Sequence, residues 1–141
     1  RDIAGIRVIC YFIDDIYNLV NALKRQSELI FIREKDYIQN PKPNGYRSFH
    51  VIIAVPVYYL DTMEYFPVEI QLRTMTMDLW ASMEHRVCYK KLPEHRDELA
   101  EAFCQYADIL GKIEEQFEAY NETGMLEEII PAQITENPTE G

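Results

Sequence analysis

Cysteine is scarce in this sequence, and its placement excludes two common ways of stabilising a small domain. The three cysteines, Cys10, Cys88 and Cys104, are odd in number and far apart, with no closely spaced pair. This pattern argues against a disulfide framework and against a thiolate zinc site. We therefore expect three buried thiols in a protein that works in a reducing compartment.

Long apolar runs are also missing. A membrane-spanning helix needs about 20 consecutive apolar residues, and neither such a run nor the pattern of a secretory signal occurs in the sequence. We expect a cytoplasmic chain that has no membrane partner. Its 141 residues suffice for one domain with a sizeable buried core.

Glycine-rich phosphate loops are absent from this sequence of only five glycines. There is no glycine-rich loop that ends in Lys-Ser or Lys-Thr, no dinucleotide fingerprint, no serine nucleophile elbow and no paired-histidine zinc motif. These absences exclude the commonest nucleotide-binding and hydrolase classes. Any chemistry must therefore depend on strand carboxylates and basic side chains.

Positive charge is nearly missing from the C-terminal third. Residues 94–141 carry two Lys or Arg against thirteen Asp or Glu, whereas residues 1–93 carry twelve against eleven. The net charge of −10 therefore comes from the C-terminal third. The balanced part contains a locally basic stretch at 33–47, which is either a solvated loop or a site for an anionic ligand.

The pattern of apolar residues predicts an α+β domain, with a mixed sheet of four to five strands flanked by helices. We expect strands at 3–12, 28–34, 46–59 and 63–74, and helices at 14–26, 75–91 and 94–120. We assign residues 1–124 to this domain and the acidic segment 125–141 to a loosely ordered tail.

The expected helix at 94–120 carries apolar residues in alternating steps of four and three. These are Leu99, Phe103, Tyr106, Leu110, Ile113, Phe117 and Tyr120. Such a stripe either packs on the domain's own core or pairs with a second chain. Because it is longer than the docking of one helix requires, we favour an oligomer interface.

Three polar side chains share one face of the last expected strand, where Glu69, Gln71 and Arg73 alternate with apolar residues. The face is either simply solvated or able to hold a metal ion, a hydroxyl and a phosphate. Asp2 heads the first expected strand. If it lies beside Glu69, the two carboxylates form an oxygen cradle for Mg²⁺.

The segment KPNGYRSFH contains more than a hairpin turn requires. Lys35, Lys42 and Arg47 are suited to neutralising a triphosphate. Tyr46 offers a ring on which a base can stack. His50 shares the expected strand face with Tyr46, which favours a binding role over a purely structural one.

These motifs resemble those of a known family. RDIAGIRV, KDYIQNPKPNGYRSFH and VEIQLRT, followed by a helix with MEH and YK, resemble the synthetase domain of the RelA/SpoT alarmone synthetases. The resemblance covers about residues 1–91 and implies a nucleotidyltransferase-like synthetase fold. It also implies transfer of pyrophosphate from ATP to the 3′-hydroxyl of GTP or GDP, which makes the alarmones of the stringent response.

The resemblance also implies roles for the candidate residues. Asp2 and Glu69 would hold Mg²⁺, Glu69 would also activate the 3′-hydroxyl, and Tyr46 would stack on guanine. The acceptor nucleotide and its phosphates would be lined by Lys35, Lys42, Asn44, His50, Gln71 and Arg73.

Within the family, the chain is similar to the small single-domain synthetases, because it contains no hydrolase histidine-aspartate motif. That group tends to form homotetramers through C-terminal helices, in agreement with the apolar stripe. The family's basic residues that grip ATP come largely from a helical segment before the first strand. We expect this segment to lie outside the 141 residues, which alone would then be inactive.

Two other functions stay open. A catalytically incomplete guanine-nucleotide sensor or RNA-binding oligomer of the same fold would have little need of a metal pair. A general nucleotidyltransferase would leave the NGYRSFH segment unexplained. The presence of both Asp2 and Glu69 favours the synthetase.

Overall fold

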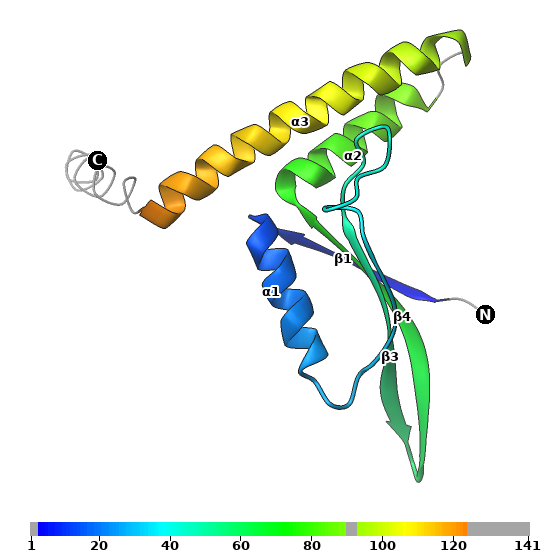
Figure 1. The fold of residues 1–141 in the computed structure, drawn as a ribbon. Coiled ribbons are helices and arrows are strands. Elements are labelled where there is room, and N and C mark those ends of the chain that lie inside the picture. Colours follow the sequence, from blue (N-terminus) through cyan, green and yellow to red (C-terminus); the bar gives the residue numbers. More distant parts are fainter. Residues whose placement is uncertain (1–2, 90–92, 124–141) are drawn as a thin grey trace, which may run out of the picture.

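The computed structural model describes residues 3–89 and 93–123 (Figure 1). Along the chain the elements are β1 (Ala4–Cys10), α1 (Ile13–Lys24), β2 (Ile30–Asp36), β3 (Phe49–Tyr59), β4 (Thr62–Thr74), α2 (Met75–Cys88) and α3 (Pro93–Thr123). The expected α+β fold is confirmed, with four strands in one mixed sheet. The assigned tail 125–141 lies outside the described residues.

The strands are ordered β1-β4-β3-β2 across the sheet. β3 runs antiparallel to both β2 and β4, whereas β1 lies parallel to β4. The first and last strands of the sequence are therefore neighbours, with Ala4 paired to Val68 and Cys10 to Thr74.

One face of the sheet is covered by α1 (Figure 1). Ile16 and Val20 of this helix are buried in one apolar cluster with Val51, Ile70 and Leu72 of β3 and β4. The strand residues are two apart and the helix residues four apart, which are the spacings that put side chains on one face. This cluster is the main core.

Capping interactions fix the starts of α1 and α2. The backbone N–H of Phe12 donates to the carboxylate of Asp15 at 3.1 Å. Thr74, the last residue of β4, accepts a hydrogen bond at its Oγ1 from the backbone N–H of Met77 at 3.3 Å. A threonine at this position satisfies an otherwise unpaired helix N–H, so β4 passes directly into α2.

A second core lies between α2 and α3, where Trp80, Phe103 and Ala107 are buried. The indole Nε1–H of Trp80 donates to the backbone carbonyl of Phe103 at 2.6 Å. About one turn earlier, at the start of α2, the hydroxyl of Thr76 donates to the carboxylate of Glu114 at 2.7 Å. α3 is therefore fastened to α2 at two separate points, and it extends beyond α2 (Figure 1).

The apolar stripe expected on the C-terminal helix divides between two environments. Leu99, Phe103 and Leu110 pack into the second core of the same chain. The prediction that these three residues contact another chain is therefore wrong. The exposed apolar residues on α3 are Tyr106, Ile109, Ile113, Phe117 and Tyr120. Although α3 has 31 residues, no helix in the described ranges is long and apolar enough to cross a membrane.

The expected burial of the three thiols also needs correction. Cys104 is exposed, and Cys10 and Cys88 are only partly buried. Cys104 is exposed because of helix geometry. The face of α3 that packs into the second core carries Phe103 and Ala107, and Cys104 does not lie on that face.

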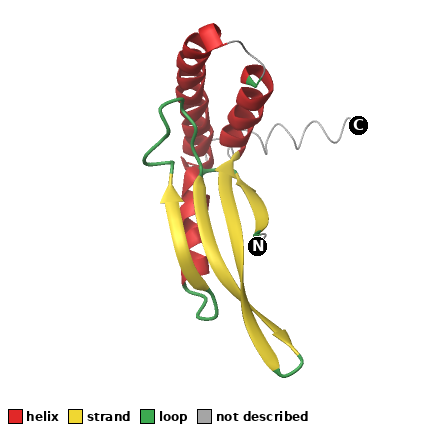
Figure 2. Cartoon of the chain, turned by 90° about the vertical axis from the view of Figure 1, so that its right-hand side faces the viewer, coloured by secondary structure: helices red, strands yellow, loops and turns green. Residues whose placement is uncertain are grey.

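β3 and β4 continue as a two-stranded hairpin beyond the other strands (Figure 2). β1 pairs with β4 only from Val68 onward, and β2 pairs with β3 only as far as Ala54. Tyr58 and Tyr59 near the tip are 68% and 72% exposed. The hairpin therefore leaves both of its strand edges unpaired within the described residues.

Candidate functional site

The sheet face opposite α1 carries a row of polar side chains. Strand pairing places Arg7 beside Gln71, Gln71 beside His50 and His50 beside Lys35. The row therefore crosses all four strands. Three of its members, Lys35, His50 and Gln71, are predicted site residues from separate parts of the sequence, and backbone pairing brings them together.

Glu69 lies on the same face, two residues before Gln71 on β4. Its neighbours across the strands are Gly5 and Ile52. Space beside Glu69 is open, because a Cβ atom added to Gly5 would meet nothing within 4 Å. A cavity of about 300 Å³ extends from Glu69 over β3 and β2. It is lined by Arg33, Glu34, Lys35, Tyr37, Lys42, His50, Ile52 and Glu69.

The hydroxyl of Tyr46 is the centre of a hydrogen-bond network beside this face. Ser48 Oγ donates to it at 2.9 Å and Arg73 Nη2 at 3.1 Å. The Nε2 atom of His50 lies 3.1 Å away. A tyrosine hydroxyl has one proton and two acceptor sites. Since Ser48 and Arg73 use both acceptor sites, the arrangement favours donation from Tyr46 to His50 and a neutral His50 with its own proton on Nδ1.

The surroundings of His50 favour the neutral imidazole. Burial lowers the pKa of His50 below its ordinary value and is the largest cause of the shift. Glu69 acts in the opposite direction, whereas Arg73, Lys42 and Lys35 lower the pKa further. At neutral pH, His50 is therefore a hydrogen-bond acceptor and not a cation.

The ring of Tyr46 is held between cations and aromatic edges. Lys42 Nζ lies 5.1 Å and Arg73 Cζ 5.5 Å from the ring centroid, within the range of cation–π attraction. The rings of Trp80 and Tyr37 meet it edge-on, at centroid distances of 6.3 and 6.1 Å. Tyr46 is therefore fixed in orientation, which suits a residue expected to stack on a base.

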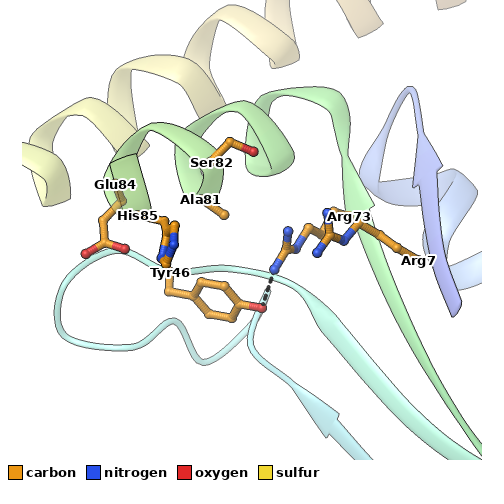
Figure 3. Close-up of a pocket in the computed structure, with 7 residues that line it drawn as sticks. All are labelled: Arg7, Tyr46, Arg73, Ala81, Ser82, Glu84 and His85. Carbon is orange, nitrogen blue, oxygen red and sulfur yellow. Dashed lines mark hydrogen bonds between the residues drawn. The ribbon is translucent and has the colours of Figure 1, made fainter. Parts of the chain in front are cut away.

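Arg73 lines a second cavity, of about 540 Å³, between β4 and α2 (Figure 3). Arg73 is 8% exposed and its Nη1 donates to Asp78 at 3.1 Å. Its Nε–H has no hydrogen-bond partner among the described residues. Leaving a buried N–H unpaired is costly, so Arg73 is held in this position at an energetic cost. The lining residues are Arg7, Tyr46, Arg73, Ala81, Ser82, Glu84 and His85.

Arg7 lines two of the cavities and had no role assigned from the sequence. It lines the larger cavity and also a smaller one of about 220 Å³ that includes Glu69 and Gln71. Its Nη1 lies 3.7 Å from Asp78, the partner of Arg73. The sequence does contain a signal for Arg7, because it is the only charged residue in the apolar run 3–12.

The remaining predicted residues lie elsewhere. Asn44 accepts a hydrogen bond from the backbone N–H of Tyr46 at 3.0 Å and lines a separate cavity that involves α2 and α3. Arg47 is directed toward α3, where its Nη2 donates to the Ala107 carbonyl at 3.0 Å, so its expected contact with a triphosphate stays a prediction. Asp2 lies outside the described residues, so its pairing with Glu69 stays a prediction.

A group of three carboxylates lies away from this face. Oxygen atoms of Asp14, Glu118 and Glu122 lie within 4.8 Å of one another. Burial raises the pKa of Glu118, and Asp14, Glu122 and Glu114 raise it further. No group of three such ligands in the described part of the chain includes Glu69.

Fold and site together define a mixed α+β domain whose open sheet face gathers a carboxylate, an amide, a neutral histidine and several basic side chains. Residues 1–94 match the family model described as the region found in RelA / SpoT proteins. The chain belongs to this family, which confirms the resemblance drawn from the sequence motifs.

Two curated relatives come from Bacillus subtilis (strain 168). GTP pyrophosphokinase YwaC is 49% identical over 116 residues, which cover 82% of this chain and 55% of the relative. GTP pyrophosphokinase YjbM is 38% identical over 90 residues, which cover 64% of this chain and 43% of the relative. The chain therefore spans about half the length of these relatives.

Solved structures give the same result for the fold. The small alarmone synthetase 2 from Bacillus subtilis superposes with a TM-score of 0.75 at 44% identity, covering 84% of this chain and 65% of that one. The small alarmone synthetase 1 from Bacillus subtilis, bound to its product pppGpp, gives 0.74 at 28% identity, covering 86% and 62%.

Proposed function

We propose that this chain is the synthetase domain of a GTP pyrophosphokinase that works in the cytoplasm. It would transfer pyrophosphate from ATP to the 3′-hydroxyl of GTP or GDP, giving guanosine pentaphosphate or tetraphosphate. The observation that carries the proposal is the row Arg7, Gln71, His50 and Lys35 beside Glu69. The names of the two pyrophosphokinase relatives and the pppGpp-bound neighbour support it.

The charges on this face suit a substrate with several phosphates. Arg33, Lys35 and Lys42 line one cavity, and Arg7 and Arg73 line the next. Transfer of a pyrophosphoryl group depends mainly on positioning the two nucleotides and neutralising their charge. The basic side chains supply the neutralisation.

Glu69 is the residue that we assign to activating the acceptor hydroxyl. The open space beside Gly5 gives a 3′-hydroxyl room to reach the carboxylate. We do not assign His50 as the base, because its Nε2 is already engaged by the Tyr46 hydroxyl at 3.1 Å. We therefore assign the role of general base to Glu69, the carboxylate beside the open space at Gly5.

Mg²⁺ is the cofactor that we propose. Carboxylate oxygens are ligands that this ion prefers, and the space beside Gly5 leaves room next to Glu69 for an ion and its waters. Glu69 would hold the ion together with Asp2. When bound, the ion would offset the negative charge of the phosphates.

We also propose that the natural protein is a homotetramer assembled through α3. Ile113, Phe117 and Tyr120 are 44%, 63% and 44% exposed, and their spacing of four and three residues places them on one side of the helix. Sedimentation velocity should show that Phe117→Asp lowers the oligomeric state, whereas the exposed charged position Glu115→Ala leaves it unchanged. A parent protein that sediments as a monomer would contradict this assembly.

Product formation by the natural protein tests the proposed activity. The protein is incubated with ATP, GTP and Mg²⁺, and the nucleotides are separated by anion-exchange chromatography. We expect pppGpp with Mg²⁺ and none after chelation by EDTA. Calorimetric GTP binding by a parent protein that makes no product would instead favour the sensor or RNA-binding module.

A further inference from the structure

Two small residues of α3, Ala107 and Gly111, form a notch against which the loop before β3 packs. Gly45 of this loop has φ +100°, a conformation that favours glycine. A Cβ atom added to Gly45 would lie 3.0 Å from both the Cβ of Ala107 and the Cα of Cys104. The loop backbone therefore approaches the helix as closely as the absence of a side chain allows.

Arg47 occupies the second half of the notch. Its Nη2 donates to the Ala107 carbonyl at 3.0 Å. A Cβ atom added to Gly111 would lie 2.9 Å from Nη2 and 3.1 Å from Nη1 of the same guanidinium. Gly111 thus leaves the space in which the Arg47 side chain lies, and Arg47 is directed toward α3.

Tyr46 lies between these two anchored residues. Within the loop, the N–H of Lys42 donates to the Tyr46 carbonyl at 3.1 Å, and the N–H of Gly45 donates to the Lys42 carbonyl at 2.9 Å. On its other side, the Tyr46 ring meets Trp80, which is hydrogen-bonded to α3. The position of Tyr46 is therefore set from α3 both through the loop and through α2.

We propose that α3 positions residues 42–47 for the acceptor nucleotide, with Arg47 as a positioning residue that acts through Tyr46. The inference deepens the proposed function and depends on it for the identity of the nucleotide. This positioning role differs from a phosphate-binding role for Arg47. A guanidinium that is hydrogen-bonded to the Ala107 carbonyl holds the loop in place and does not itself contact the substrate.

The substitution Gly111→Ala distinguishes a positioning role of Arg47 from a phosphate-binding role. The added methyl group displaces the flexible end of Arg47, while alanine is a better helix former than glycine, so the melting temperature should stay equal or rise. In the natural protein, we expect the KM for GTP to rise roughly fivefold, as for the loss of one hydrogen bond. The kcat and the KM for ATP should stay within about twofold. Gln116→Ala, at an exposed position of the same helix, is the matched control.

Hydrogen–deuterium exchange gives a second readout that needs no nucleotide. We expect faster exchange of the amides in residues 42–47 in Gly111→Ala, with exchange in α2 unchanged. Faster exchange together with an unchanged KM for GTP would overturn the positioning role, and unchanged exchange would overturn the anchoring by α3. If the parent protein binds no GTP, the proposed function fails, and the exchange measurement alone decides whether α3 holds the loop.

Discussion

The two faces of the sheet are formed by the same strands but differ in burial and polarity. On the face covered by α1, Val51 and Leu72 are completely buried. On the opposite face, His50 and Gln71, which flank them in the sequence, remain partly accessible and line cavities. Because strand side chains alternate, one strand supplies a buried core residue and an accessible polar residue at neighbouring positions.

The largest expected effect is on turnover. Glu69→Gln keeps the size of the side chain but removes the basic carboxylate, so turnover should fall roughly a thousandfold, within the range for loss of a general base. The free energy of unfolding should change by less than about 0.5 kcal/mol. Pyrophosphate transfer assays and urea denaturation measure the two quantities. Near-normal turnover would remove Glu69 from the mechanism.

On the face covered by α1, a substitution should affect stability much more than a substitution on the open face does. Leu72→Ala creates a cavity in the main core and should lower the free energy of unfolding by about 3 kcal/mol. Gln71→Ala, its neighbour on the open face, is the matched control and should change stability by less than about 0.5 kcal/mol. Urea denaturation measures both. Equal losses for the two variants would mean that the faces are not separated in function.

The ring of Tyr46 should matter for one nucleotide only. Tyr46→Ala should weaken GTP binding about tenfold, the size expected for a lost base-stacking contact, and should leave ATP binding nearly unchanged. Tyr46→Phe keeps the ring and should retain most of the GTP affinity. Calorimetric titration with each nucleotide gives the comparison, and equal losses of GTP and ATP affinity would exclude stacking on guanine.

The smallest effect should come from pH. The pKa of His50 is lowered in the folded state, so the unfolded state binds its proton more readily. The contribution of neutral His50 to stability is therefore complete above its ordinary pKa of about 6.5 and is lost as pH falls through the lowered value. Unfolding measured between pH 5 and 7.5 should show a weaker pH dependence in His50→Gln. The same pH dependence in both proteins would assign it to other groups.

The alternation of polar and apolar residues made much of the fold predictable. The strand with Glu69, Gln71 and Arg73 was expected at 63–74 and is observed at Thr62–Thr74, because period-two patterning is a property of the local sequence. β3 begins at Phe49 and not at residue 46. Tyr46 and Ser48 continue the alternation, but hydrogen bonds among residues 42–46 form a turn instead.

The candidate site was predictable only in part, because its assembly depends on strand order. Nothing local in the sequence places Lys35 beside His50 or Gln71 beside Arg7, since both pairs follow from the register. Arg47 shows the limit of charge patterns. Its charge indicated a phosphate contact, but the direction of its side chain depends on the space above Gly111, 64 positions further along the sequence.

The polar row across the sheet has a consequence for protein engineering. Its four side chains are aligned by backbone pairing of the strands, and each strand contributes one of them. A substitution of one of these side chains leaves the backbone pairing intact, and this pairing positions the other three side chains. The chemistry of this face can therefore be changed one strand at a time, while the residues under α1 continue to form the main core.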